Sequence, residues 1–104
     1  MTRMYLIQVL LPLRDNAGHL FGEHVFKSIN GALVGEFGGV TAFSLSPAKG
    51  TWVNANREER DDVIVVEVMA EALDRLWWQT FRKQLEADLG QAEIVVRALA
   101  IERL

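Results

Sequence analysis

The chain has no cysteine, only two prolines and no long uninterrupted hydrophobic run. Without cysteine it can form no disulfide, thiolate metal site or cysteine nucleophile, and it is compatible with a reducing compartment. Its longest apolar stretch, 4–13, is interrupted by Gln8 and Pro12. That stretch is much shorter than the ~20 residues of a membrane-spanning helix, and it lacks the cleavage site of a secretory signal. We therefore expect a soluble cytoplasmic protein without a membrane partner.

Basic clusters are absent as well. Eleven Lys and Arg residues are interspersed with fourteen Asp and Glu residues, which gives a net charge of −3. Nucleic-acid-binding proteins usually carry a basic patch or stripe. RNA-recognition modules also display stacking aromatics on their central strands, whereas the apolar segments 4–11 and 63–69 contain only Tyr5. We expect no nucleic-acid partner.

The composition that remains is ordinary for a folded protein, with 50% hydrophobic and 24% charged residues. A chain of 104 residues is close to the commonest domain size, so we expect one domain over 1–104. Alternating and continuous apolar runs predict strands, whereas apolar residues spaced three and four apart predict helices. The predicted order is a strand at 4–11, a helix at 21–37, strands at 40–45 and 63–69, a helix at 70–89 and a strand at 94–101.

Glycines mark the ends of both predicted helices. Gly38 and Gly90 follow the last apolar residue of each helical pattern, where glycine accepts the left-handed conformation of a helix C-terminus. In the second helix Trp78 points about 100° away from its neighbour in the apolar stripe. We therefore expect Trp78 to be half exposed or at an interface, and Trp52 to be a second contact anchor. The stripe itself contains Leu73, Leu76, Trp77, Phe81, Leu85 and Leu89.

Three predicted strands are almost continuously apolar, and each contains one polar interruption. Gln8 interrupts 4–11, Glu67 interrupts 63–69, and Arg97 interrupts 94–101. Near-continuous apolar strands are typical of sheets that are buried on both faces. Two helices can cover only one face of a sheet in a chain of this size. The second face is therefore expected to contact another subunit or a ligand, with Leu6 and Leu99 as interface candidates.

This element order, combined with strands that are apolar on both faces, resembles the dimeric α+β barrel superfamily. The resemblance implies a ferredoxin-like fold, in which a four-stranded antiparallel sheet carries two helices on one face. It also implies a homodimer whose two sheets face each other around a pair of pockets. The superfamily includes cofactor-independent monooxygenases, muconolactone-type isomerases and haem-handling enzymes. No residue that identifies one of these families is present, and we expect no cofactor.

Strand parity places the three polar interruptions on one face. If the helices cover the purely apolar faces, Gln8, Glu67 and Arg97 all emerge on the helix-free face. Two interpretations are open. In the first, Glu67 and Arg97 form a buried ion pair, bridged by Gln8, that fixes the register of a dimer. In the second, the three residues line a pocket and bind a small polar or carboxylate ligand, with Arg97 as electrophile and Glu67 as base.

A second polar group surrounds the start of the first predicted helix. Asp15, His19, Glu23 and His24 lie close together in the sequence. The histidines are five residues apart, which turns them about 140° from each other on a helix. Metalloprotease histidines are four apart on one helical face, so we expect exposed histidines and no metal site.

The chain carries no catalytic signature, and whether it is an enzyme stays open. One hypothesis is a homodimer that binds or transforms a small organic molecule over the helix-free sheet face. The alternative is a non-catalytic interaction or structural module, in which apolar side chains fill the dimer interface and leave no usable void.

Overall fold

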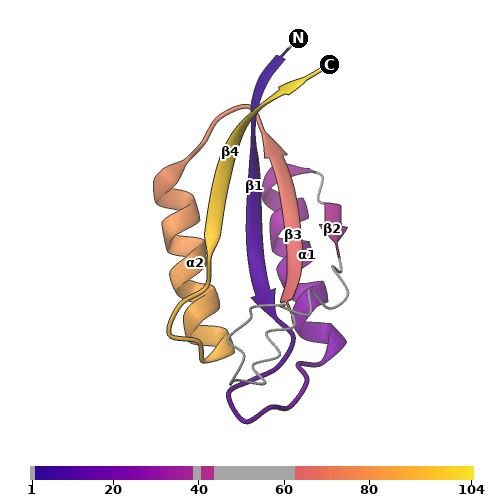
Figure 1. Ribbon diagram of the computed structural model, residues 1–104, viewed down its shortest axis with the longest axis vertical. Helices are drawn as coiled ribbons and strands as arrows, with labels where there is room; N and C mark the ends of the chain where they lie inside the picture. Colours follow the sequence, from indigo (N-terminus) through magenta and orange to yellow (C-terminus); the bar gives the residue numbers. More distant parts are fainter. Residues whose placement is uncertain (1, 39–40, 44–62) are drawn as a thin grey trace, which may run out of the picture.

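The computed structural model describes residues 2–38, 41–43 and 63–104. These residues confirm the predicted α+β class, with two helices and an antiparallel sheet (Figure 1). The elements in chain order are β1 (Thr2–Pro12), α1 (Glu23–Phe37), β2 (Thr41–Phe43), β3 (Val63–Ala70), α2 (Arg75–Leu89) and β4 (Val96–Arg103).

Strand β1 lies in the middle of the sheet and pairs antiparallel with β3 on one side and β4 on the other. The three-residue β2 pairs with the outer edge of β3, so that the strand order is β2-β3-β1-β4. Strand β1 ends at Pro12, which has no N–H to donate to a neighbouring strand. The central position of β1 means that its side chains set the register of both long neighbours.

Both helices pack on the same face of the sheet. The buried residues on this face of β1 belong to one core with buried residues of α1 and α2. Ile7, Val9 and Leu11 alternate along β1 and are fully buried. The other buried members of this core are Val66, Val68, Ile29, Leu33, Trp78, Leu85, Leu89 and Ile94. The apolar faces that the sequence assigned to the helices are therefore the ones that the helices cover.

Glycine ends each helix as predicted. Gly38 follows α1 with a φ of 77°, and its N–H donates to the carbonyl of Val34. Gly90 follows α2 with a φ of 62°. Residues with a side chain rarely adopt these left-handed values, so the two glycines define where the helices stop.

The structure corrects the predicted start and face of the second helix. Helix α2 begins at Arg75, five residues later than predicted, and the Asp74 carboxylate caps it by accepting a hydrogen bond from the N–H of Trp77 at 3.0 Å. On a helix Trp78 lies about 20° from the buried Leu85, seven residues later, whereas Leu76 lies about 180° from it, so Leu76 does not belong to the apolar stripe. Trp78 is only 4% exposed, whereas Leu76 is 73% exposed. The prediction that Trp78 is half exposed and an interface candidate is therefore wrong.

Trp78 instead belongs to an aromatic cluster that joins the end of α1 to the start of α2. The ring of Phe37 stacks on Trp78 with centroids 5.0 Å apart and packs edge-on against Trp77. Trp77 in turn stacks on Phe81. Aromatic pairs in these geometries stabilise a fold beyond the area that they bury, so the cluster fixes the two helices relative to each other.

The predicted strand at 40–45 is represented by β2, while Trp52 lies outside the described residues. Neither α1 nor α2, the helices of the described part, is long and apolar enough to span a membrane.

We predict that Leu33→Ala lowers the free energy of unfolding by about 2–5 kcal/mol, because it leaves a cavity under the sheet. Leu33 is fully buried, whereas its neighbour Val34 is 47% exposed. Val34→Ala is the matched control and should change stability by less than about 0.5 kcal/mol. Urea denaturation followed by circular dichroism measures both. Equal effects of the two substitutions would contradict the assignment of the buried face of α1.

Candidate functional site

The face of the sheet opposite the helices is called the open face here. Parity places on it the side chains of Leu6, Gln8, Leu10, Val65, Glu67, Met69, Val95, Arg97 and Leu99. The middle of this face is polar, and apolar side chains lie on both sides of the polar group.

Gln8, Glu67 and Arg97 form a hydrogen-bonded line across the three long strands, which we call the polar row. Gln8 on β1 is opposite Glu67 on β3 and opposite Arg97 on β4. The Gln8 side-chain NH₂ donates to Glu67 Oε2 at 2.7 Å, and its Oε1 accepts from Arg97 Nε at 2.6 Å. The amide thus presents its acceptor to the cation and its donor to the anion, the orientation that both charges favour. The structure brings together all three residues that the sequence singled out.

The polar row keeps unused hydrogen-bonding capacity. Within the described residues, neither terminal nitrogen of Arg97 makes a hydrogen bond, and neither does Glu67 Oε1. Arg97 is exposed, whereas Gln8 and Glu67 are half-buried. Within the described residues Glu67 and Arg97 form no direct ion pair, since each is bonded to Gln8, and the row lacks the burial that the first interpretation requires. The row has unused donors at one end and an unused acceptor at the other.

Apolar side chains flank the polar row on both sides. Leu6 is paired with Met69 and Leu99 in one line, and Leu10 lies between Val65 and Val95 in the other. Met69 and Leu99 are 48% and 47% exposed, and Val95 is 43% exposed. Val65, by contrast, is already buried within the subunit. The exposed apolar surface of the open face thus lies at Leu99 and Val95 on the side of β4 and at Met69 on β3.

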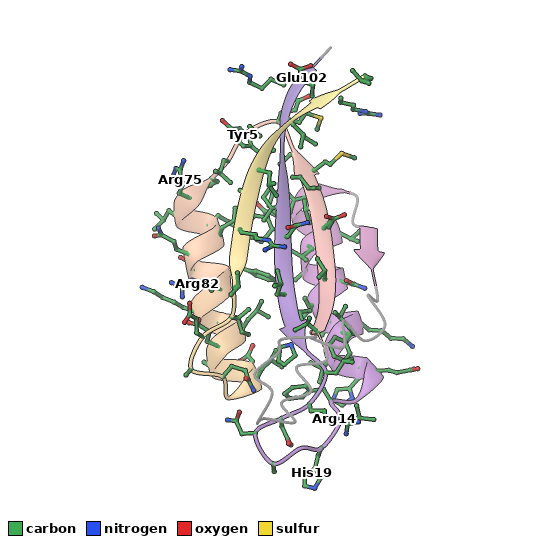
Figure 2. All side chains as sticks on the ribbon, in the orientation of Figure 1. Tyr5, Arg14, His19, Arg75, Arg82 and Glu102 are labelled. Carbon is green, nitrogen blue, oxygen red and sulfur yellow. The ribbon has the colours of Figure 1, made fainter. Side chains whose placement is uncertain are left out.

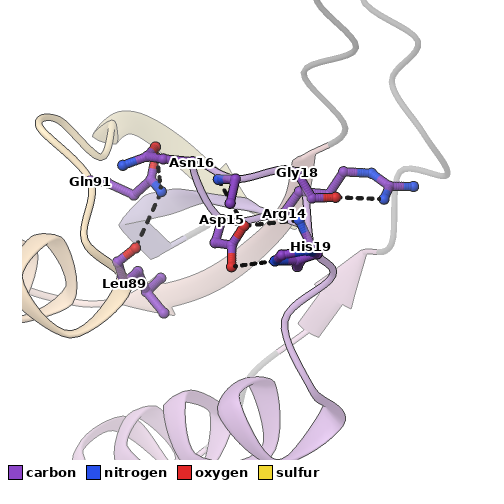
Figure 3. Close-up of polar contacts among 8 residues, drawn as sticks. Arg14, Asp15, Asn16, Gly18, His19, Leu89 and Gln91 are labelled. Atoms are coloured by element: carbon purple, nitrogen blue, oxygen red, sulfur yellow. Dashed lines mark hydrogen bonds and ion pairs between the residues drawn. The ribbon is translucent and has the colours of Figure 1, made fainter.

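The polar residues between β1 and α1 are organised by the turn that contains them (Figure 3). The carboxylate of Asp15 accepts hydrogen bonds from the backbone N–H groups of Ala17 and His19 at 3.0 and 2.8 Å. Asn16 then ties this turn to the end of α2, because its side-chain NH₂ donates to the carbonyl of Gly90 at 2.8 Å. Asp15 and Asn16 therefore have structural roles here.

His19 lies at the tip of this turn, far from the sheet (Figure 2). Its Nδ1 is 3.7 Å from the Asp15 carboxylate, and both His19 and His24 are exposed. Within 2–38, 41–43 and 63–104, no group of three or more His, Asp or Glu side chains is arranged to hold a metal ion.

The described residues form two cavities on the helix side of the sheet. One has a volume of about 190 Å³ and is formed by β1, α2 and β4, with Ile7, Trp78 and Val96 among its lining residues. The other has a volume of about 220 Å³ and lies between the two helices, where His24, Ser28 and Asp88 surround an apolar floor. Sequence reasoning missed both, because each joins elements whose relative placement no local pattern specifies.

Comparisons with known proteins identify no relative. The chain matches no protein family, and no curated protein or solved structure was found to match it. The polar row, the open face and the cavities are therefore the features that bear on its function.

We predict that Glu67→Gln moves a side-chain NH₂ proton resonance of Gln8 upfield in ¹⁵N–¹H spectra. The reason is that a hydrogen bond to a carboxylate is stronger than one to a neutral amide. Glu71→Gln is the control, because Glu71 is exposed and follows β3 outside the polar row. A Gln8 resonance that responds equally to both substitutions would contradict the hydrogen bond.

Proposed function

We propose that this protein is a homodimer in which the open faces of two subunits pack together and bind a small organic molecule between them. Each subunit would have the ferredoxin-like arrangement, with the four-stranded sheet of the dimeric α+β barrel superfamily. A cytoplasmic location fits this proposal. The observation that carries it is the polar row with unused hydrogen-bonding groups at the centre of an apolar sheet face.

The apolar lines supply the driving force for association. Leu99, Met69 and Val95 are each nearly half exposed. Burial of such surface contributes about 25 cal/mol per Å². Facing sheets pack about 10 Å apart, so the side chains of two open faces can interdigitate.

The charges of the polar row favour a second copy of this chain as the partner. The row runs from an anion on β3, through Gln8, to a cation on β4. A twofold axis between the sheets and parallel to β1 exchanges the sheet edges, and it places Arg97 opposite Glu67 of the partner subunit. An axis across the strands would place Arg97 opposite Arg97 of the partner subunit, which charge repulsion disfavours. The open face is thus complementary to itself in one orientation.

The small-molecule part of the proposal rests on Arg97. Its two terminal nitrogens make no hydrogen bond within the described residues, and a guanidinium is well suited to carboxylates and other planar anions. The polar row supports binding rather than a particular reaction.

The alternative is a non-catalytic module with a filled interface. The internal hydrogen bonds of the polar row favour this alternative. Gln8 already provides one hydrogen-bond partner for Glu67 and one for Arg97, so the two charges depend less on a ligand. Native mass spectrometry of the purified dimer separates the two functions. A retained molecule that Arg97→Leu removes supports binding, whereas a dimer mass without any addition supports the filled interface.

We predict that the protein elutes as a dimer of twice 11.7 kDa and that Leu99→Asp converts it to a monomer. A carboxylate at this position would be buried without a partner in the interface. Leu76→Asp is the matched control, because Leu76 is even more exposed but lies on α2. Size-exclusion chromatography with light scattering measures both variants. A monomeric wild type, or dissociation by Leu76→Asp alone, would contradict the proposed interface.

We also predict that Arg97→Glu weakens the dimer by about 3–5 kcal/mol. The new carboxylate would face Glu67 of the partner subunit, so that two negative charges would be buried without a cation. The exchange Glu67→Arg with Arg97→Glu preserves one cation and one anion in each row and should restore most of the affinity. Analytical ultracentrifugation gives the three dissociation constants. An exchange variant as weak as the single variant would exclude pairing between the rows.

A further inference from the structure

The two polar rows of the proposed dimer face each other with opposite charges. The twofold axis parallel to β1 places Arg97 opposite Glu67 of the partner subunit, and Glu67 opposite Arg97 of the partner subunit. The interface therefore contains two equivalent pairs of one cation and one anion, which we call the mixed pairs. Each mixed pair takes one residue from each subunit, so neither subunit can form it alone.

Gln8 holds the charged groups of a row along their own sheet. Its Oε1 accepts from Arg97 Nε at 2.6 Å, and its NH₂ donates to Glu67 Oε2 at 2.7 Å. Since facing sheets lie about 10 Å apart, groups held in this way leave space between the two members of a mixed pair. The terminal nitrogens of Arg97 and Oε1 of Glu67 keep their hydrogen-bonding capacity within the described residues.

The charges of a mixed pair select the chemistry of a bound molecule. Buried charges need partners of opposite sign, so a dicarboxylate would be repelled by Glu67 and a diamine by Arg97. A zwitterion satisfies both members, because its carboxylate accepts from a guanidinium while its ammonium donates to a carboxylate. In an α-amino acid both groups are attached to one carbon, which suits a narrow gap. The apolar lines beside the row, where Met69 and Leu99 are nearly half exposed, favour an apolar side chain.

We propose that each mixed pair binds one small apolar α-amino acid between the two subunits. The carboxylate of the ligand accepts from the terminal nitrogens of Arg97, and its ammonium donates to Glu67 of the partner subunit. The apolar side chain packs against the line of Leu6, Met69 and Leu99. This ligand class rests on the proposed function, since the mixed pairs exist only in the dimer.

Isothermal titration calorimetry of the wild-type protein with leucine tests the ligand class. Isocaproate has the same carbon skeleton without the ammonium, and isopentylamine lacks the carboxylate. Leucine should saturate at one molecule per subunit, and each of the other probes should bind about tenfold more weakly, as expected when one charged hydrogen bond is lost. Equal binding of leucine and isocaproate would overturn the zwitterion and leave a binding site for anions.

Light scattering on the same samples separates failure of this proposal from failure of the proposed function. A dimer that binds none of the three probes would overturn the amino-acid site and favour the filled interface. A monomer would overturn the dimer together with its mixed pairs.

A mixture of two variants tests whether the site is shared between subunits. Arg97→Leu and Glu67→Gln should each lower leucine affinity about tenfold, whereas Glu71→Gln, outside the polar row, should leave it unchanged. In a heterodimer, Arg97 of the Glu67→Gln subunit meets Glu67 of the Arg97→Leu subunit, so one mixed pair is intact. Leucine binding should therefore recover in the mixture, with native mass spectrometry recording the exchange of subunits. Heterodimers that form without recovery of binding would overturn a site between the subunits.

Discussion

The register of the central strand is the constraint on which the other features depend. β1 pairs with β3 and β4 at once, and side chains alternate between the two faces along every strand. The same pairing that buries Ile7 and Val9 under the helices places Gln8 between Glu67 and Arg97 on the opposite face. A slip of one residue would exchange the faces and bury the amide in the core. The packing of the core therefore also fixes the positions of Gln8, Glu67 and Arg97 on the opposite face.

Arg97 is the residue on which the proposed function of the open face depends most. It lies on β4 at the edge of the long strands, where its Nε joins the polar row and its terminal nitrogens make no hydrogen bond within the described residues. A guanidinium with unused donors can pair with a carboxylate of a partner subunit or of a small ligand. Both parts of the proposed function therefore use the same cation.

Much of this arrangement follows from the sequence. Strong periodicity and terminal glycines predicted both helices, and parity placed the three polar interruptions on one face before any pairing was known. The start of α2 could not be predicted from apolar spacing, because Leu73 continues the pattern outside the helix while the Asp74 cap begins it later. The environments of Leu76 and Trp78 were exchanged for another reason: Trp78 is about 20° from the buried Leu85 on the helix, whereas Leu76 is about 180° from it. The cavity was missed because it depends on how α2 packs against β4, which no short motif records.

The central claim is that the open face is buried against a second copy of the chain. Its most direct test is an isotope-filtered NOE experiment on a mixture of labelled and unlabelled protein, which detects only contacts between subunits. The account predicts intersubunit NOEs among the methyl groups of Leu6, Met69 and Leu99. Intersubunit NOEs confined to α1 and α2, or none at all at millimolar protein concentration, would contradict it.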